Sequence, residues 1–123
     1  MTLAYVAAAL ADWPTARHVM TVLRGHGVVI THDWTVSAEA WFSGDEQFRA
    51  GALLPDSNAQ LAQSILRAVY RSDVVIFIGP GRRGAHVELG AALASPCRVI
   101  LVPGNSPEEY PCPFHYHPAV RRV

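Results

Sequence analysis

The chain has 123 residues, of which half are hydrophobic and 16% are charged, and its formal net charge is zero. This length suits one globular domain with a core, and the composition excludes a disordered chain. Because the net charge is zero, no overall field attracts a nucleic-acid polymer or an anionic membrane, and we expect neither as a partner. All ten basic residues are arginines, which excludes a Schiff-base lysine and a Walker-type phosphate lysine.

The two cysteines, Cys97 and Cys112, lack the CxxC spacing of a zinc site and are too few for a disulfide framework. We therefore expect both cysteines to be free thiols in a reducing compartment. His115 and His117 share a face if the chain is extended there, but no third ligand is evident from the sequence, so we predict no metal and no other cofactor. The N-terminal apolar run lacks a positive flank and is shorter than a membrane span, and we expect a cytoplasmic protein.

Strand and helix patterns alternate along the chain. Short apolar or β-branched runs predict strands at 3–9, 28–34, 73–79 and 98–102. Helices are expected between them, one capped by Asp12 with Pro14 in its first turn, one capped by Asp56, Ser57 or Asn58, and one over 86–94. The stretch 35–57 is long for a connection and predicts a functional loop or short helices. The proline-rich tail 103–123 is predicted to be irregular.

This alternation predicts a single α/β domain over residues 1–123, a three-layer Rossmann- or flavodoxin-like fold with a parallel sheet in the order 2-1-3-4. Ligands of such sheets bind beyond the carboxyl ends of the strands, where the strand order reverses. The loops at that point are 8–13 and 79–85, so Ala8 and Trp13 are candidates for substrate contact. Trp13 can stack on a nucleobase, and a packing role is the alternative.

The loop GPGRRG, which opens the third predicted helix, has the features of an anion site. Gly79, Gly81 and Gly84 permit positive φ and close approach of the backbone to a ligand. The free N–H groups of the helix start favour an anion, and Arg82 and Arg83 carry guanidinium groups suited to phosphate or carboxylate. The spacing matches neither the dinucleotide pattern nor the Walker loop, so a structural turn with solvated arginines is the alternative.

Three polar residues near this crevice are further candidates. Glu88 is expected in about the first turn of the helix, where the helix dipole favours its ionised form. A carboxylate beside a sugar can attack an anomeric carbon or stabilise an oxocarbenium ion, and a capping role is the alternative. His86 can contact a phosphate or face solvent. Asp33, at the end of the second predicted strand, can bond a sugar hydroxyl or cap a turn.

Four motifs carry a family resemblance: YVAA at 5–8, ITHDW at 30–34, SDVVI at 72–76 and, most specific, GAHVELGAALA at 84–94. Together they resemble the nucleoside 2-deoxyribosyltransferase family and its relatives that hydrolyse the N-glycosidic bond of 2'-deoxynucleoside 5'-monophosphates. The resemblance implies that Glu88 is the nucleophile, that Tyr5 positions it and that Arg82 contacts an anionic 5' group. It also implies a homodimer or larger homo-oligomer, in which C-terminal residues of a neighbouring subunit complete the site.

The sequence departs from the family pattern at one position. Catalytic members usually carry an aspartate in the helix before the third strand, as the acid for the leaving base, whereas this chain reads AQSI at 62–65. Asp56 or Asp33 are the candidate substitutes. We therefore expect cleavage or transfer at the N-glycosidic bond of a (deoxy)nucleoside 5'-monophosphate or nucleoside. The alternative is a catalytically silent nucleotide-binding or sensing module on the same fold.

Overall fold

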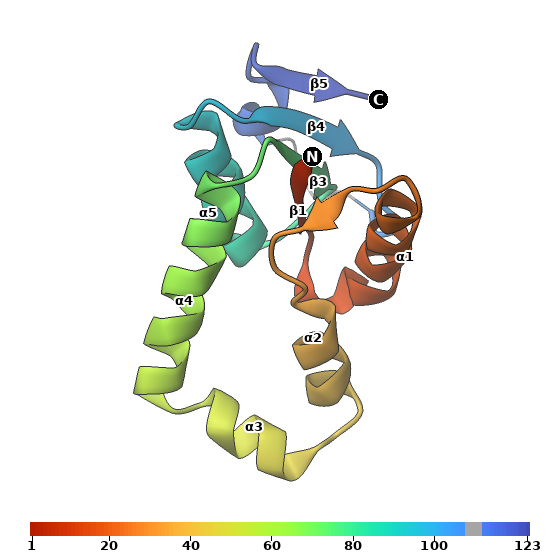
Figure 1. Ribbon diagram of the computed structural model, residues 1–123. Helices are drawn as coiled ribbons and strands as arrows, with labels where there is room; N and C mark the ends of the chain where they lie inside the picture. The colour runs from red at the N-terminus through yellow and green to blue at the C-terminus, as the bar shows by residue number, and fades with distance from the viewer. Residues whose placement is uncertain (108–111) are drawn as a thin grey trace.

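The structure is a computed structural model that describes residues 1–107 and 112–123. Figure 1 shows the elements around a central sheet. In chain order they are β1 (Leu3–Ala7), the 3-10 turn η1 (Leu10–Asp12), α1 (Trp13–Gly25), β2 (Val29–Ile30), α2 (Thr35–Phe42), α3 (Glu46–Ala52), α4 (Pro55–Tyr70), β3 (Val74–Ile78), α5 (Arg83–Leu93), β4 (Arg98–Val102), η2 (Pro113–Tyr116) and β5 (Val120–Arg122).

The five strands form one parallel sheet in the order β2-β1-β3-β4-β5. Tyr5 of β1 lies opposite Val75 of β3, and Ile76 of β3 lies opposite Ile100 of β4. β1 and β3 are the buried central strands, as their continuous apolar runs predict for a sheet covered on both faces. The expected α/β fold is confirmed, and the predicted order 2-1-3-4 is extended by one strand.

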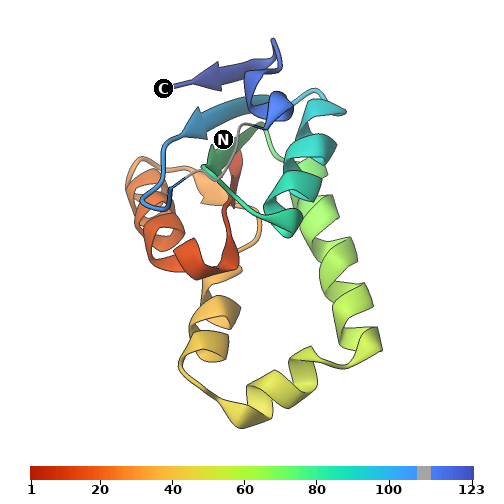
Figure 2. The same cartoon turned by 180° about the vertical axis from the view of Figure 1, so that it is seen from behind.

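Helices cover both faces of the sheet. α1 packs against β1 and β2, whereas α4 and α5 pack against each other and against the central strands. The apolar residues of α1 recur at helical spacing, so Ala16 and Met20 are fully buried in the core. Figures 1 and 2 show α2, α3 and the start of α4 extending as an arm beyond the sheet.

The tail is more ordered than its proline content predicts. The prediction that 103–123 is irregular is wrong for η2 and for β5, which pairs in parallel with β4. The signal is weak in the sequence because β5 is only three residues long and two of them are exposed arginines. Val120 packs against the core and His115 is buried, so long-range contacts order this segment.

The boundaries before β3 also differ from prediction. The predicted strand 28–34 shrinks to β2, because Asp33 accepts a hydrogen bond from the Thr35 backbone N–H and starts α2. The stretch 35–57 forms α2 and α3, in agreement with the short helices that were one of the two expectations. The predicted caps Asp56, Ser57 and Asn58 are wrong, because α4 begins earlier, at Pro55, whose fixed φ suits a first helical position. Among the described helices, none is long and apolar enough to cross a membrane.

Candidate active site

The turn between β3 and α5 is built around glycine. Gly81 has a φ of +72°, and a Cβ at this position would collide with the ring of Phe77. Both facts require glycine here. The Gly79–Pro80 peptide is cis, and the Gly79 N–H donates to the Val102 carbonyl at 2.8 Å. α5 begins at Arg83, three residues before its predicted start, so the N–H groups of its first turn face this loop.

A cavity of about 730 Å³ lies beside this turn. Its lining comes from the loops that follow β1 and β3, which are the two loops that the sheet topology singles out, and from the tail. The lining residues are Ala9, Ala11, Asp12, Pro80, Gly81, Arg82, Arg83, His86, Ser106, Pro107, Cys112, Pro113, Phe114 and His115. The volume falls within the usual range for small-molecule sites.

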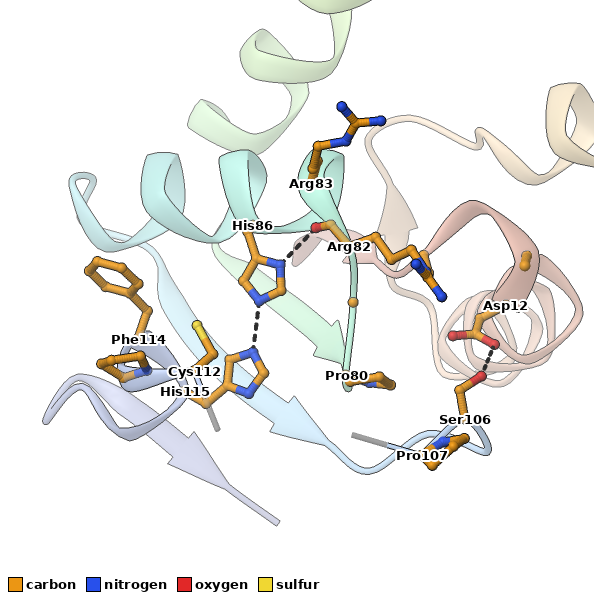
Figure 3. A pocket seen from close by; sticks show the side chains of 14 residues that line it. Asp12, Pro80, Arg82, Arg83, His86, Ser106, Pro107, Cys112, Phe114 and His115 are labelled. Atoms are coloured by element: carbon orange, nitrogen blue, oxygen red, sulfur yellow. Dashed lines mark hydrogen bonds between the residues drawn. The ribbon is translucent and has the colours of Figure 1, made fainter. Parts of the chain in front are cut away.

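Two charged groups of opposite sign face each other across this cavity. In Figure 3 the Arg82 side chain extends toward Asp12, whereas the Arg83 guanidinium points away from the other labelled residues. Asp12 occupies the N-cap position of α1 as predicted, but its side chain makes no capping hydrogen bond. Instead its Oδ1 accepts a hydrogen bond from the Ser106 hydroxyl at 3.0 Å, and its Oδ2 is buried with no partner among the described residues. This oxygen can accept a hydrogen bond from a ligand.

Glu88 forms a buried pair with Tyr5 of β1. The Glu88 residue is 9% exposed and the Tyr5 residue 1% exposed. Burial raises the pKa of Glu88 to about 7, although a hydrogen bond from the Tyr5 hydroxyl acts in the opposite direction. Burial and the neighbouring Glu88 carboxylate raise the pKa of Tyr5 well above its ordinary value, so Tyr5 stays protonated and can donate.

Glu88 lies in the second turn of α5, not in the first turn as predicted, because the helix starts earlier. The effect of the helix dipole falls off within the first turn. Loss of hydration therefore outweighs the dipole at Glu88, and the proton is held more tightly than in water. A carboxyl group that titrates near neutral pH suits nucleophilic or acid–base chemistry, and such groups gather at functional sites.

Glu88 and the cavity lie on different flanks of α5. Residues that are two positions apart in an α-helix are separated by about 200° around its axis. His86 and Glu88 therefore point in nearly opposite directions. His86 lines the cavity, whereas Glu88 is not among the described lining residues. Gly84 stands one turn before Glu88 on the same flank, and helical side chains lean toward the N-terminus. Gly84 is exposed, and a Cβ built there would meet no atom within 4 Å, so space is open one turn before Glu88.

The structure gives the remaining sequence candidates local partners. The ring of Trp13 packs against the core, and the Arg17 guanidinium lies 4.7 Å from its centroid. Asp33 bonds to Thr35 and forms an ion pair with Arg24 at 3.1 Å. Burial would raise the pKa of Asp33, but these hydrogen bonds and the arginine charge outweigh burial and lower it.

Neither Trp13 nor Asp33 is among the described residues that line the cavity. Ala8 is buried beside it, and Ala9 is the alanine that lines it. Of the sequence candidates, the cavity thus brings together Gly81, Arg82, Arg83 and His86.

Several lining residues were missed as site residues by sequence reasoning. Asp12 and Ser106 meet across the cavity from distant parts of the chain, and His115 and Cys112 reach it from the tail. The spacing of these residues carries no signal, because the contacts join segments that are distant in the sequence and that only the folded sheet brings together.

Comparisons with known proteins support the fold. No family model matches the chain, and no curated protein matches its sequence. Among solved structures, the chain is similar to the CMP N-glycosidase BcmB of Clostridium botulinum, with a TM-score of 0.63 and 17% identity. The alignment covers 98% of this chain and 87% of that one. The likeness shows that the two chains share an α/β fold over nearly their whole lengths.

Proposed function

We propose that this protein cleaves the N-glycosidic bond of a nucleoside 5'-monophosphate, with Glu88 as the nucleophile. The observation that carries the proposal is the buried pair of Glu88 and Tyr5, in which a carboxyl group with a pKa of about 7 is held one turn inside the start of α5. A carboxyl group is seldom buried to this extent without a chemical reason.

The proposed reaction has two steps. The ionised Glu88 attacks C1' of the sugar, and the base leaves with the electrons of the glycosidic bond and takes up a proton. Water, or a second base, then attacks C1', releases the carboxylate and gives up a proton to solvent, which balances the proton that the leaving base takes up. Tyr5 orients the Glu88 carboxylate through its hydroxyl, which stays protonated because burial raises its pKa.

The 5'-phosphate is assigned to the start of α5. Its free backbone N–H groups and the positive end of the helix dipole favour an anion, and the loop before it brings the Gly81 backbone close. Arg82 extends into the cavity at this point (Figure 3) and adds a charge-assisted hydrogen bond. The solved relative is described as acting on CMP, a nucleotide of this class.

A silent nucleotide-binding module is the second candidate. It is favoured by the position of Glu88 outside the described cavity lining and by the partners of Asp33, which already holds Thr35 and Arg24. Asp56, the other substitute for the missing acid, lies exposed on α4. This candidate predicts that nucleotides bind without release of the base.

A chromatographic screen distinguishes the two candidates. Ribo- and 2'-deoxynucleosides and their 5'-monophosphates, CMP and dCMP included, are incubated with the protein and analysed for free base. The proposal predicts base release from at least one monophosphate and slower release from the matching nucleoside. A thermal shift by nucleotides without any base release would instead establish the silent module.

We also propose a homodimer or larger homo-oligomer. The arm formed by α2, α3 and the start of α4 exposes large apolar side chains, among them Leu53 at 71% and Phe42 at 49%. Monomeric proteins rarely expose large contiguous apolar patches, so exposed apolar side chains of this size are suited to contact with a second copy. Light scattering coupled to size exclusion tests this, and substitution of Leu53 and Leu54 by serine is expected to reduce the oligomer mass.

A further inference from the structure

Three potential metal ligands converge where the tail crosses α5. They are His86 of α5 and, from the tail, Cys112 and His115, and their candidate ligand atoms all lie within 4.8 Å of one another. Figure 3 shows the two imidazoles end to end, with the Cys112 sulfur beside them. The cluster lies on the flank of α5 opposite Glu88, so the argument that follows does not rest on the proposed function.

The hydrogen bonds of His86 fix its tautomer. Its Nδ1 lies 2.7 Å from the Arg82 carbonyl oxygen, which can only accept, so Nδ1 carries the proton. Nε2 then carries a lone pair, which accepts a hydrogen bond from the Nε2–H of His115 at 3.0 Å, and a metal ion would take the place of that proton. A backbone carbonyl that holds one ring nitrogen and aims the other is the usual outer shell of a metal-ligating histidine.

The separations are close to those of a tetrahedral zinc site, and the two imidazole rings, whose Nε2 atoms now face each other, must turn to converge on the ion. Zn–N bonds of about 2.0–2.1 Å and a Zn–S bond of about 2.3 Å imply separations of about 3.3 Å between the nitrogens and about 3.6 Å from nitrogen to sulfur. The observed 3.0 Å between the two Nε2 atoms is close to the first value. The candidate ligand atoms lie within 4.8 Å of one another, so each nitrogen-to-sulfur separation exceeds the tetrahedral value by no more than about 1.2 Å.

The surroundings are suited to a bound ion. Phe77 is fully buried, and its ring lies 5.2 Å from that of His86 and 5.1 Å from that of His115. His115 is itself only 5% exposed. An apolar wall on one side restricts water, while the cavity on the other side gives an entry path and room for a further ligand.

We propose that His86, Cys112 and His115 form a zinc site whose fourth position opens into the cavity. One thiolate and two imidazoles are a donor set that favours Zn²⁺ over the oxygen-seeking Mg²⁺ and Ca²⁺. The ion would link η2 to α5 and so hold the tail in place as one wall of the cavity. Because the ligands must lose protons to bind, zinc uptake releases protons.

Titration of the chelator-treated full chain with Zn²⁺ and with Co²⁺ tests the site. The proposal predicts one ion per chain and, with Co²⁺, a thiolate-to-metal charge-transfer absorption. Cys112→Ser should abolish that absorption and weaken zinc binding by at least about tenfold. Tenfold is the smallest loss of affinity that substitution of an outer-shell partner typically causes, and loss of a direct ligand should cost no less. Cys97→Ser is the matched control, because that thiol bonds to Ser95 and Ala92 elsewhere.

Melting curves without and with zinc guard against a folding artefact. Zinc should raise the melting temperature of the wild type and of Cys97→Ser, but not that of Cys112→Ser. If Cys112→Ser is already destabilised without metal, His115→Gln replaces it, with His117→Gln as its control. The proposal is overturned if zinc binding does not saturate at one ion per chain, or if both cysteine variants bind zinc alike.

Discussion

The Tyr5 hydroxyl of β1 donates a hydrogen bond to the Glu88 carboxylate of α5, and both residues are buried. The pair joins β1, one of the two buried strands of the sheet, to the helix that follows the glycine turn. Burial alone would hold the proton on Glu88, and the hydrogen bond from Tyr5 partly counteracts this by favouring the ionised form. The balance leaves Glu88 near half-ionised at neutral pH.

The pH dependence of turnover should report this balance. If ionised Glu88 is the nucleophile, kcat/KM should rise about tenfold between pH 6 and 8, following a pKa of about 7 in the free protein. Tyr5→Phe removes the hydrogen bond that lowers this pKa, so the acid limb should move to higher pH. Initial rates of base release over this range measure both effects. A limb that stays in place in Tyr5→Phe would contradict the role assigned to Tyr5.

Stability should depend on pH in the direction set by the same group. The pKa of Glu88 is raised in the folded state, so its contribution is complete below about pH 4.5 and is lost as the pH rises through about 7. A shift from 4.5 to about 7 corresponds to roughly 3 kcal/mol. Glu88→Gln should therefore flatten the fall in unfolding free energy between pH 5 and 8, as measured by urea denaturation at each pH. An equally steep fall in the variant would exclude Glu88 as its source.

Access of the substrate to Glu88 should depend on the absence of a side chain at Gly84. Gly84→Leu covers the space one turn before Glu88, and it should lower kcat/KM by at least about tenfold without loss of stability, because leucine favours the helix over glycine. Gly90→Leu is the control on the same helix, since Gly90 is also exposed with open space around its Cβ. Both variants should melt at or above the wild-type temperature. Equal effects on catalysis would refute the proposed route.

Substitution of Arg82 and substitution of Arg83 should have different effects on kcat/KM, although the two residues are neighbours in the sequence. Arg82 extends into the cavity, whereas the Arg83 guanidinium points away from it. Loss of one charge-assisted hydrogen bond costs about 1.5–3 kcal/mol, so Arg82→Ala should lower kcat/KM for a 5'-monophosphate roughly 10- to 100-fold. The corresponding nucleoside should be little affected, and Arg83→Ala should change neither. A loss that is the same for nucleotide and nucleoside would argue against a phosphate contact.

The sheet was predictable because its signals are local. The apolar runs of β1, β3 and β4 and the helices between them require a parallel sheet, and the right-handed crossover rule leaves few orders for the strands. β5 was not predictable, because it has only three residues and depends on β4 for its pairing. The start of α5 was placed too late for a local reason, since Arg83 and Gly84 look like part of the glycine turn.

The lining of the cavity was predicted in part for the same reason. Arg82 and His86 belong to one continuous motif, so the sequence indicates both. Asp12, Cys112 and His115 belong to other segments, and only the folded sheet brings them to the cavity. The expected ionised state of Glu88 also relied on the helix dipole, whereas its burial against Tyr5, a tertiary effect, decides its pKa.

The central claim is that Glu88 attacks C1' of a nucleoside 5'-monophosphate. The most direct measurement compares base release by the wild type and Glu88→Gln, while acid-quenched protein is analysed by peptide mass spectrometry. We predict loss of turnover in the variant, and in the wild type a sugar-phosphate adduct on the peptide that contains Glu88. Base release at the wild-type rate by Glu88→Gln, or an adduct on another carboxylate, would contradict the account.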